Sequence, residues 1–328
     1  MVRDARAWVP VFEIPKGFVP RSPSKAPIPI GFGRPFGFDP GMRSLRWFLF
    51  LGLLGVVFAD EPAKTAAPSA SVSATRSPSP WPASARIDTW KGFRRLRFEV
   101  DGCEAWVVEP AQAAPGKPWT WCMEFPDAFT ERTGVPDLLK LGFHHLHLVV
   151  GNTFGSPAAQ AHLDAFYGVV TNAGLASKGA LIGISRGGLY AYRFAARNPD
   201  RVACIYGDAP VCDFKSWPGG KGKGPGSPGD WKKLLGDYGF ADEAEALAFR
   251  GNPVDTLEPL AKAGVRLIHV VGDADEPVPV AENTALVEER YRKLGGTIRV
   301  LHKVGGGHHP HGLEDPAPVV RFVVESAK

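Results

Sequence analysis

The sequence predicts an α/β fold: a mostly parallel, doubly wound sheet with an antiparallel N-terminal hairpin and a small lid insertion. Three observations predict it. Over the last two thirds of the chain, short apolar runs alternate with amphipathic helical patterns, which is typical of β-α-β units. An alternating segment with a tight turn precedes them. One interval of nearly sixty residues between two strand patterns is too long for a simple crossover.

The hairpin is predicted around Asp101 and Gly102. Leu96 and Phe98 alternate with charged residues, as on a half-buried strand. An Asp-Gly pair at the end of such a run is typical of a type I′ turn, because both central residues of that turn need a positive φ. The chain should therefore return as a second strand over 103–109.

Strands and helices then alternate. Over 156–173, Ser156 is a suitable N-cap and Pro157 a suitable first helical residue. Further helices are expected over 281–294, which stops before two glycines, and over 316–325. Six short apolar runs are expected as strands: 119–125, 145–150, 180–184, 202–206, 266–271 and 297–302. The long interval before 266 is expected to form a lid over about 211–262, at the carboxyl edge of the sheet where α/β folds bind ligands.

The N-terminal part of the chain has a different composition. Residues 1–41 carry eight prolines and no period, so we expect them to be an over-extended start or disordered. Residues 42–59 have a basic start, a short apolar run and a small-residue end, which are the parts of a secretory signal peptide. An uncleaved anchor after a long tail is the alternative. An Ala/Pro/Ser-rich linker over 60–86 would then lead to a folded domain over 87–328, secreted or periplasmic, with no stable membrane span.

Export changes the charge balance. Residues 1–59 hold eight of the 38 Lys/Arg and three of the 34 Asp/Glu, which leaves 30 basic and 31 acidic residues. A nearly neutral domain argues against a nucleic-acid partner. The cysteines lack the Cys-x-x-Cys spacing of structural zinc sites, and four cysteines allow three disulfide pairings, although Cys204 in a strand pattern is expected to be a buried thiol. Oligomeric state has no signal in the sequence.

The segment Gly183-Ile184-Ser185-Arg186-Gly187 lies between a strand pattern and a helical pattern. The five-residue pattern alone arises readily by chance, so its setting carries the argument. A strand that reverses sharply into a helix places the serine at the tip of a tight turn, where glycines avoid clashes. The helix expected over 188–198 also points its N-terminus, which favours negative charge, at Ser185.

A serine hydroxyl becomes a good nucleophile when a base takes its proton and a carboxylate orients that base. Asp275 follows the strand pattern 266–271, and His308 follows the pattern 297–302 after three glycines. The order Ser, Asp, His, each just beyond a strand, is that of the α/β-hydrolases. We therefore expect a catalytic triad of Ser185, Asp275 and His308, with no metal and no cofactor.

Alternatives remain within each loop. Asp275 is preferred to Asp273 because Gly-x-x-Asp-x-x-Val-Pro resembles the acid loop of dienelactone hydrolases and prolyl oligopeptidases, and Asp273 is expected to brace the turn. Asp208, after the strand pattern 202–206, is a second candidate acid. His309 and His311 are expected to contact substrate or lid if His308 is the base.

An oxyanion needs two N–H donors. The N–H of Arg186, directly after the nucleophile, is the first. Because Pro126 has no N–H, the second comes from Phe125 or Asp127, which the sequence does not separate. Glu124 either hydrogen-bonds within the site or braces this loop, and bracing is the preferred interpretation. The histidines of the segment 144–147 are expected to be structural. Strand geometry puts His145 and His147 on one face and turns His144 away, and no adjacent carboxylate cluster completes a ligand set.

From about Pro118 to the C-terminus, the chain resembles a bacterial α/β-hydrolase family. The matching segments are 117–119, 124–125, 183–191, 208–219, 272–276 and 307–312. Members look like secreted esterases of bacteria that process polysaccharides. The chain departs from the pattern at Cys122, where a basic residue is expected, which puts any substrate contact there in doubt.

The resemblance implies a secreted serine esterase that acts through an acyl-enzyme on a small-molecule or glycan ester, with a carbohydrate acetyl or acyl ester as the preferred substrate. Trp217 and Trp231 in the lid can stack on sugar rings or pack the core of the lid itself. A prolyl-oligopeptidase-like serine peptidase is the first alternative. A non-catalytic binding module on a hydrolase scaffold is the second. Acyl-chain length has no signal in the sequence.

Overall fold

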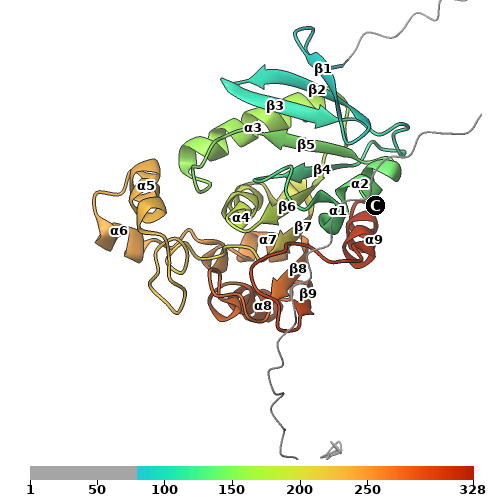
Figure 1. The fold of residues 1–328 in the computed structure, drawn as a ribbon. Coiled ribbons are helices and arrows are strands. Elements are labelled where there is room, and N and C mark those ends of the chain that lie inside the picture. The colour runs from blue at the N-terminus through green and yellow to red at the C-terminus, as the bar shows by residue number, and fades with distance from the viewer. Residues whose placement is uncertain (1–79) are drawn as a thin grey trace, which may run out of the picture. The chain divides into compact units, whose positions relative to one another are not determined.

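A computed structural model describes residues 80–328. Within this range a single mixed sheet has the strand order β1-β2-β3-β5-β4-β6-β7-β8-β9 (Figure 1). The neighbours from β1 to β5 pair antiparallel, and those from β5 to β9 pair parallel. The strands are β1 (Arg86–Trp90), β2 (Phe93–Val100), β3 (Cys103–Val108), β4 (Trp119–Cys122), β5 (His144–Leu148), β6 (Gly179–Ile184), β7 (Val202–Asp208), β8 (Arg266–Gly272) and β9 (Ile298–Lys303).

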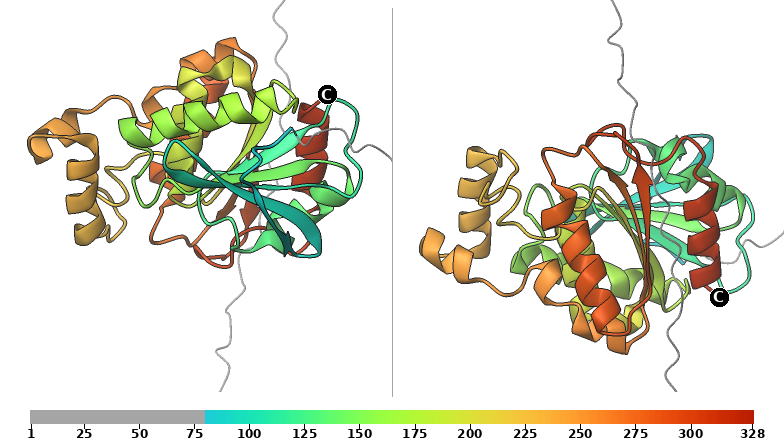
Figure 2. Two further views of the ribbon diagram at one scale, coloured as in Figure 1. Left: turned by 90° about the horizontal axis from the view of Figure 1, so that it is seen from above. Right: turned by 90° about the horizontal axis from the view of Figure 1, so that it is seen from below.

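Helices cover both faces of this sheet (Figure 2). Apolar residues of α3, α4, α7 and α8 form one core with the sheet, and those of α2 and α9 form a second core on the other face. The sheet is therefore doubly wound, as predicted. The helices are α1 (Thr130–Thr133), α2 (Val135–Lys140), α3 (Pro157–Asn172), α4 (Gly187–Arg197), α5 (Pro228–Tyr238), α6 (Glu243–Ala248), α7 (Glu258–Lys262), α8 (Thr284–Lys293) and α9 (Ala317–Ser326), with 3-10 turns at Pro199–Arg201, Pro253–Asp255 and Val280–Glu282.

Local sequence signals explain the start of the sheet and the longest helix. Asp101 and Gly102 have φ of 50° and 76°, as a type I′ turn requires, and they join β2 to β3. The Oγ of Ser156 accepts a hydrogen bond from the N–H of Ala159 at 3.5 Å and so caps α3, which begins at Pro157.

Two segments differ from the expectation. The strand β4 ends at Cys122 rather than at Phe125, because the backbone of Phe125 is left-handed, with φ of 57°, and turns the chain away from the sheet. The linker expected over 60–86 does not extend to its last residues. Trp81 is buried and stacks on Phe98, with 5.9 Å between the ring centroids. This contact holds the segment before β1 against the sheet.

The predicted lid segment (211–262) contains α5, α6 and α7, and Figure 1 shows α5 and α6 standing apart from the sheet. Two hydrogen bonds tie this segment to the loop that follows β5. Tyr238 donates to the carbonyl of Phe154 at 2.9 Å, and Asn152 donates to Asp230 at 3.2 Å. The lid segment therefore contacts the rest of the domain at the carboxyl edge of the parallel strands.

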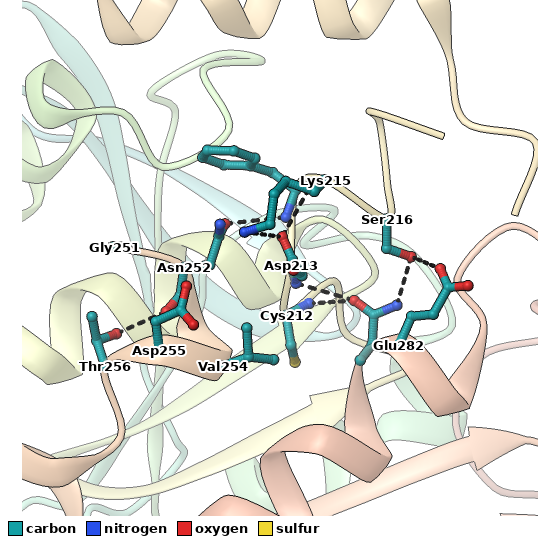
Figure 3. A network of polar contacts seen from close by, with 12 residues as sticks. Cys212, Asp213, Lys215, Ser216, Gly251, Asn252, Val254, Asp255, Thr256 and Glu282 are labelled. Atoms are coloured by element: carbon teal, nitrogen blue, oxygen red, sulfur yellow. Dashed lines mark hydrogen bonds and ion pairs between the residues drawn. The ribbon is translucent and has the colours of Figure 1, made fainter. Parts of the chain in front are cut away.

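Figure 3 shows a network of polar contacts at the first residues of the lid segment, where Cys212, Asp213 and Ser216 lie near Glu282. Asn283 connects these residues. The side-chain oxygen of Asn283 accepts from the N–H groups of Cys212 and Asp213 at 2.8 and 3.2 Å. Its amide donates to Ser216, which donates in turn to Glu282 at 2.7 Å. Because Asn283 precedes α8, this network fixes the lid segment to the part of the chain that follows the predicted acid loop.

The four cysteines are free thiols: Cys103, Cys122, Cys204 and Cys212. The predicted signal peptide over 42–59 and the predicted extra residues 1–41 lie outside the described residues. Among the helices of residues 80–328, none combines the length and apolar character needed to cross a membrane.

Candidate active site

Ser185 occupies a sharp turn between β6 and α4. Its φ is 49°, a left-handed value, and its N–H donates to the carbonyl of Asp208 at 2.8 Å. The glycines around it are required by close approach. A Cβ on Gly183 would lie 3.0 Å from the carbonyl oxygen of Gly187, and one on Gly188 would lie 2.6 Å from that of Val211. The sequence therefore folds this segment into the turn that exposes a serine hydroxyl.

The structure brings Ser185, His308 and Asp275 together. The Oγ of Ser185 lies 3.0 Å from Nε2 of His308, and Nδ1 of His308 lies 2.8 Å from Oδ2 of Asp275. Asp275 is 1% exposed and His308 is 10% exposed, so the carboxylate is shielded while the imidazole reaches the surface of the site. The geometry permits proton transfer from the serine to an imidazole that a buried carboxylate orients.

Three loops at the carboxyl ends of β6, β8 and β9 supply these side chains. The acid and base loops also support each other. The N–H of Ala274 donates to the carbonyl of Gly306 at 2.8 Å, and a Cβ on Gly272 would come within 2.3 Å of the carbonyl oxygens of Gly306 and Gly307. Gly272, in the acid loop, thus allows the two loops to touch.

The alternative acids have other partners. Asp273 pairs with His302 at 2.7 Å on the surface, where both side chains are at least 40% exposed. Asp208 is fully buried and pairs with His311, its Oδ1 lying 2.8 Å from Nδ1. Asp275 is therefore the carboxylate that reaches His308.

The remaining histidine of the base loop is exposed. His309 stacks on Phe129, with 5.9 Å between the ring centroids. The structure thus gives His308, His309 and His311 three different settings, which the sequence order alone did not distinguish.

The loop after β4 lies beside the start of α4, which follows Ser185. A Cβ on Gly187 would lie 3.2 Å from the Cβ of Glu124, so this loop faces the start of α4. Arg186 is the N-cap of α4, where backbone N–H groups lack intrahelical partners. The side chain of Asp127 accepts from the indole of Trp90 at 2.6 Å and ties the loop to β1. The N–H groups of Phe125 and Asp127 both remain candidates for the second oxyanion donor.

Glu124 and the guanidinium of Arg186 form a charged pair that the sequence did not predict. Their atoms Oε1 and Nη2 are 3.4 Å apart, and both side chains are largely buried. The guanidinium also lies 4.8 Å from the ring centre of Phe125. Burial raises the pKa of Glu124, and the positive charge of Arg186 opposes that rise. The preferred role of Glu124 as a brace is compatible with this pair, which also places polar groups next to Ser185 in sequence.

The two tryptophans of the lid segment differ in burial. Trp231 is buried against Phe214, with 6.0 Å between the ring centroids, and packs the core of the lid segment itself. Trp217 is only partly buried and lies 6.2 Å from Phe154. Trp217 therefore remains the candidate for contact with a substrate.

The histidines at β5 and the cysteine on β4 have structural surroundings. Nδ1 of His145 lies 2.8 Å from the hydroxyl of Thr120, and burial lowers the pKa of His145 to about 3. Nδ1 of His147 bonds the carbonyl of Cys122 at 2.8 Å. Burial raises the pKa of the Cys122 thiol to about 12, so this side chain stays neutral beside the oxyanion loop.

No protein-family model and no curated protein sequence matches the chain. Solved structures match it in fold. A puromycin-hydrolyzing peptidase of Mycobacterium tuberculosis aligns with a TM-score of 0.54 and 15% identity, over 73% of this chain and 42% of the peptidase. Est1E from Butyrivibrio proteoclasticus aligns with a TM-score of 0.50 and 16% identity, over 74% of this chain and 98% of Est1E. A bifunctional GH43-CE protein of Bacteroides eggerthii aligns with a TM-score of 0.56 and 18% identity, over 69% of this chain and 36% of that protein.

The chain therefore has the α/β-hydrolase fold, and the predicted fold class is confirmed. It spans less than half of the length of the peptidase and of the GH43-CE protein. Est1E, by contrast, is matched over nearly all of its length.

Proposed function

We propose that this protein is an exported serine hydrolase that cleaves carboxylic esters through an acyl-enzyme. The observation that carries the proposal is the chain of two hydrogen bonds from Ser185 through His308 to Asp275, 3.0 and 2.8 Å long. The left-handed backbone of Ser185 and its place at the start of α4 add to it. Export rests on the signal-like segment over 42–59.

The reaction follows from these positions. The Oγ of Ser185 attacks the ester carbonyl while Nε2 of His308 takes its proton, and Asp275 holds Nδ1–H and stabilises the imidazolium. The N–H of Arg186 donates to the oxyanion. When the tetrahedral intermediate collapses, His308 gives its proton to the leaving alcohol. Water, deprotonated by His308, then attacks the acyl-enzyme and releases the carboxylic acid and free Ser185.

Carbohydrate acetyl esters are the proposed substrates. The charged pair of Glu124 and Arg186 offers donors and acceptors to a hydroxyl-rich alcohol, and the partly exposed Trp217 can stack on a sugar ring. One structural neighbour is the bifunctional GH43-CE protein, and another is Est1E. A panel of p-nitrophenyl esters of increasing chain length and of acetylated sugars tests the substrate class. Activity should fall steeply beyond acetyl, and a preference for long acyl chains would contradict the proposal.

A prolyl-oligopeptidase-like peptidase is the second candidate, because a peptidase of M. tuberculosis shares the fold. Hydrolysis of a peptide anilide at a rate comparable to that of p-nitrophenyl acetate would favour it. The third candidate, a non-catalytic binding module, predicts no labelling by a fluorophosphonate. We expect labelling of the wild-type chain and none of Ser185→Ala, with kcat reduced by about 10⁴- to 10⁶-fold in the variant.

A further inference from the structure

Three histidine rings converge at the rim of the proposed active site. The ring centroids of His308, His309 and His311 lie 4.7 to 4.9 Å apart, and the rings are nearly perpendicular to one another. One ligand atom from each residue lies within 4.8 Å of the other two. No metal site is expected from the sequence, and the order of residues in a loop does not show that three rings converge.

The hydrogen bonds decide which nitrogens are available. Nδ1 of His308 is engaged by Asp275, and Nδ1 of His311 is engaged by Asp208, each at 2.8 Å. Nε2 is therefore left for a ligand in His311. In His308, Nε2 has the hydroxyl of Ser185 as its partner at 3.0 Å, and a metal ion would take the place of that hydrogen bond. Zinc-binding histidines use the same arrangement, in which a carboxylate on the other ring nitrogen fixes the tautomer and makes the free nitrogen more basic.

His309 completes the set from the exposed side. Its ring is accessible to solvent and can adjust its position, whereas His311 is held in the interior.

We propose that His308, His309 and His311 bind one Zn²⁺ ion. Zinc takes three imidazoles at about 2.0–2.1 Å with a fourth position left for an oxygen. The Oγ of Ser185, 3.0 Å from Nε2 of His308, or a water can supply that oxygen. The carboxylates of Asp275 and Asp208 balance the charge of the ion. Tetrahedral coordination requires nitrogens about 3.4 Å apart, so the three rings would move closer together on binding, and the exposed ring of His309 has the most room to do so.

Zinc binding has a consequence that rests on the proposed function. Nε2 of His308 has one lone pair, which cannot bind a metal and accept the proton of Ser185 at the same time. Zn²⁺ would therefore be a reversible inhibitor of ester hydrolysis. The metal site itself does not depend on the activity of the enzyme.

Isothermal titration of the purified chain with ZnCl₂ tests the site. We expect one tight equivalent per chain, and at least a tenfold weaker Kd in His309→Ala. The control is His162→Ala, which removes a half-exposed histidine on α3 that pairs with Asp101, and it should bind as the wild type does. MgCl₂, which prefers oxygen ligands, should give no binding. Equal zinc affinity of the two variants would overturn the site.

Inhibition is measured separately, with p-nitrophenyl acetate and each variant compared with its own metal-free rate. Zn²⁺ should inhibit the wild type at concentrations near its Kd, chelation should restore the rate, and His309→Ala should need at least tenfold more zinc. If the chain binds zinc through His309 but hydrolyses no ester, the metal site is supported and the proposed function is wrong. If the enzyme is active but His309→Ala does not change its affinity for zinc, the proposed function is supported and the metal site is wrong.

Discussion

Asp208 and His311 form a buried pair, with Oδ1 and Nδ1 2.8 Å apart although the residues are 103 positions apart in sequence. The other oxygen of Asp208 accepts from the N–H of Gly312 at 2.8 Å and from the hydroxyl of Tyr206. These bonds fix the end of the histidine loop to β7. They place the carboxylate one strand away from Asp275, where it supports the loop rather than the base.

Asp208→Ala should lower the free energy of unfolding by about 3 kcal/mol, because it leaves buried hydrogen-bonding groups without their partner. Urea denaturation measures the loss. Asp273→Ala is a matched control, since Asp273 makes the same kind of bond to His302 on the surface. That variant should lose less than about 1 kcal/mol. Equal losses in the two variants would contradict the structural role of Asp208.

Asp275→Asn should reduce kcat by about 10⁴-fold with little change in KM, because the amide no longer holds the productive tautomer of His308. Steady-state kinetics on p-nitrophenyl acetate measures the change. Asp273→Asn, two residues away on the same loop, should keep kcat within about threefold. A larger effect of Asp208→Asn than of Asp275→Asn would move the role of the acid to Asp208.

Asn283→Ala should loosen the start of the lid segment. The side chain makes four hydrogen bonds, two of them to backbone N–H groups and one to the carbonyl of Pro279. We expect a loss of about 2–3 kcal/mol of stability and faster hydrogen exchange at the amides of Cys212 and Asp213. Asn198→Ala, at the far end of α4, is the control and should leave exchange at these amides unchanged. Protection as in the wild type after Asn283→Ala would contradict the anchor.

His269 should make stability depend on pH. Burial lowers its pKa to about 3, while its ring bonds Tyr192 and Thr284 in the neutral form. Below pH ~6.5, His269 binds a proton in the unfolded chain but not in the folded chain. The contribution of neutral His269 to the free energy of unfolding is therefore complete above pH ~6.5. It falls by about 1.4 kcal/mol per pH unit as the pH drops towards 3.

Unfolding measured in urea at several pH values between 7 and 4 checks this dependence. His269→Gln should reduce the slope by one proton, whereas His162→Gln, at a half-exposed position, should keep the slope of the wild type. Burial also lowers the pKa of His145 to about 3, so His145 should account for part of the pH dependence that remains in His269→Gln. An unchanged slope in His269→Gln would show that this residue titrates normally in the folded chain.

Much of the fold was predictable because local signals agree with it. The Asp101–Gly102 turn, the cap at Ser156 and the alternation of apolar runs with helices each follow from short segments. The sequence also predicts that Ser185, Asp275 and His308 lie at one edge of the sheet, because each comes directly after a strand, and parallel strands bring their carboxyl ends to one edge.

What the sequence could not supply depends on contacts between distant segments. The pairing of Asp208 with His311, and of Glu124 with the side chain of Arg186, is decided by how neighbouring loops pack. No sequence pattern around these four residues indicates which residue each one contacts. The end of β4 was also misplaced, because the apolar residues continue past the point at which Phe125 turns left-handed.

The strands β7 and β8 are direct neighbours, so everything between them leaves the sheet and returns to it at adjacent positions. The three loops that carry Ser185, His308 and Asp275 lie outside that interval. The lid segment (211–262) can therefore change in length or sequence without altering the order of the strands. Any such change must keep backbone N–H groups for Asn283 to accept from, because the start of the segment is held there.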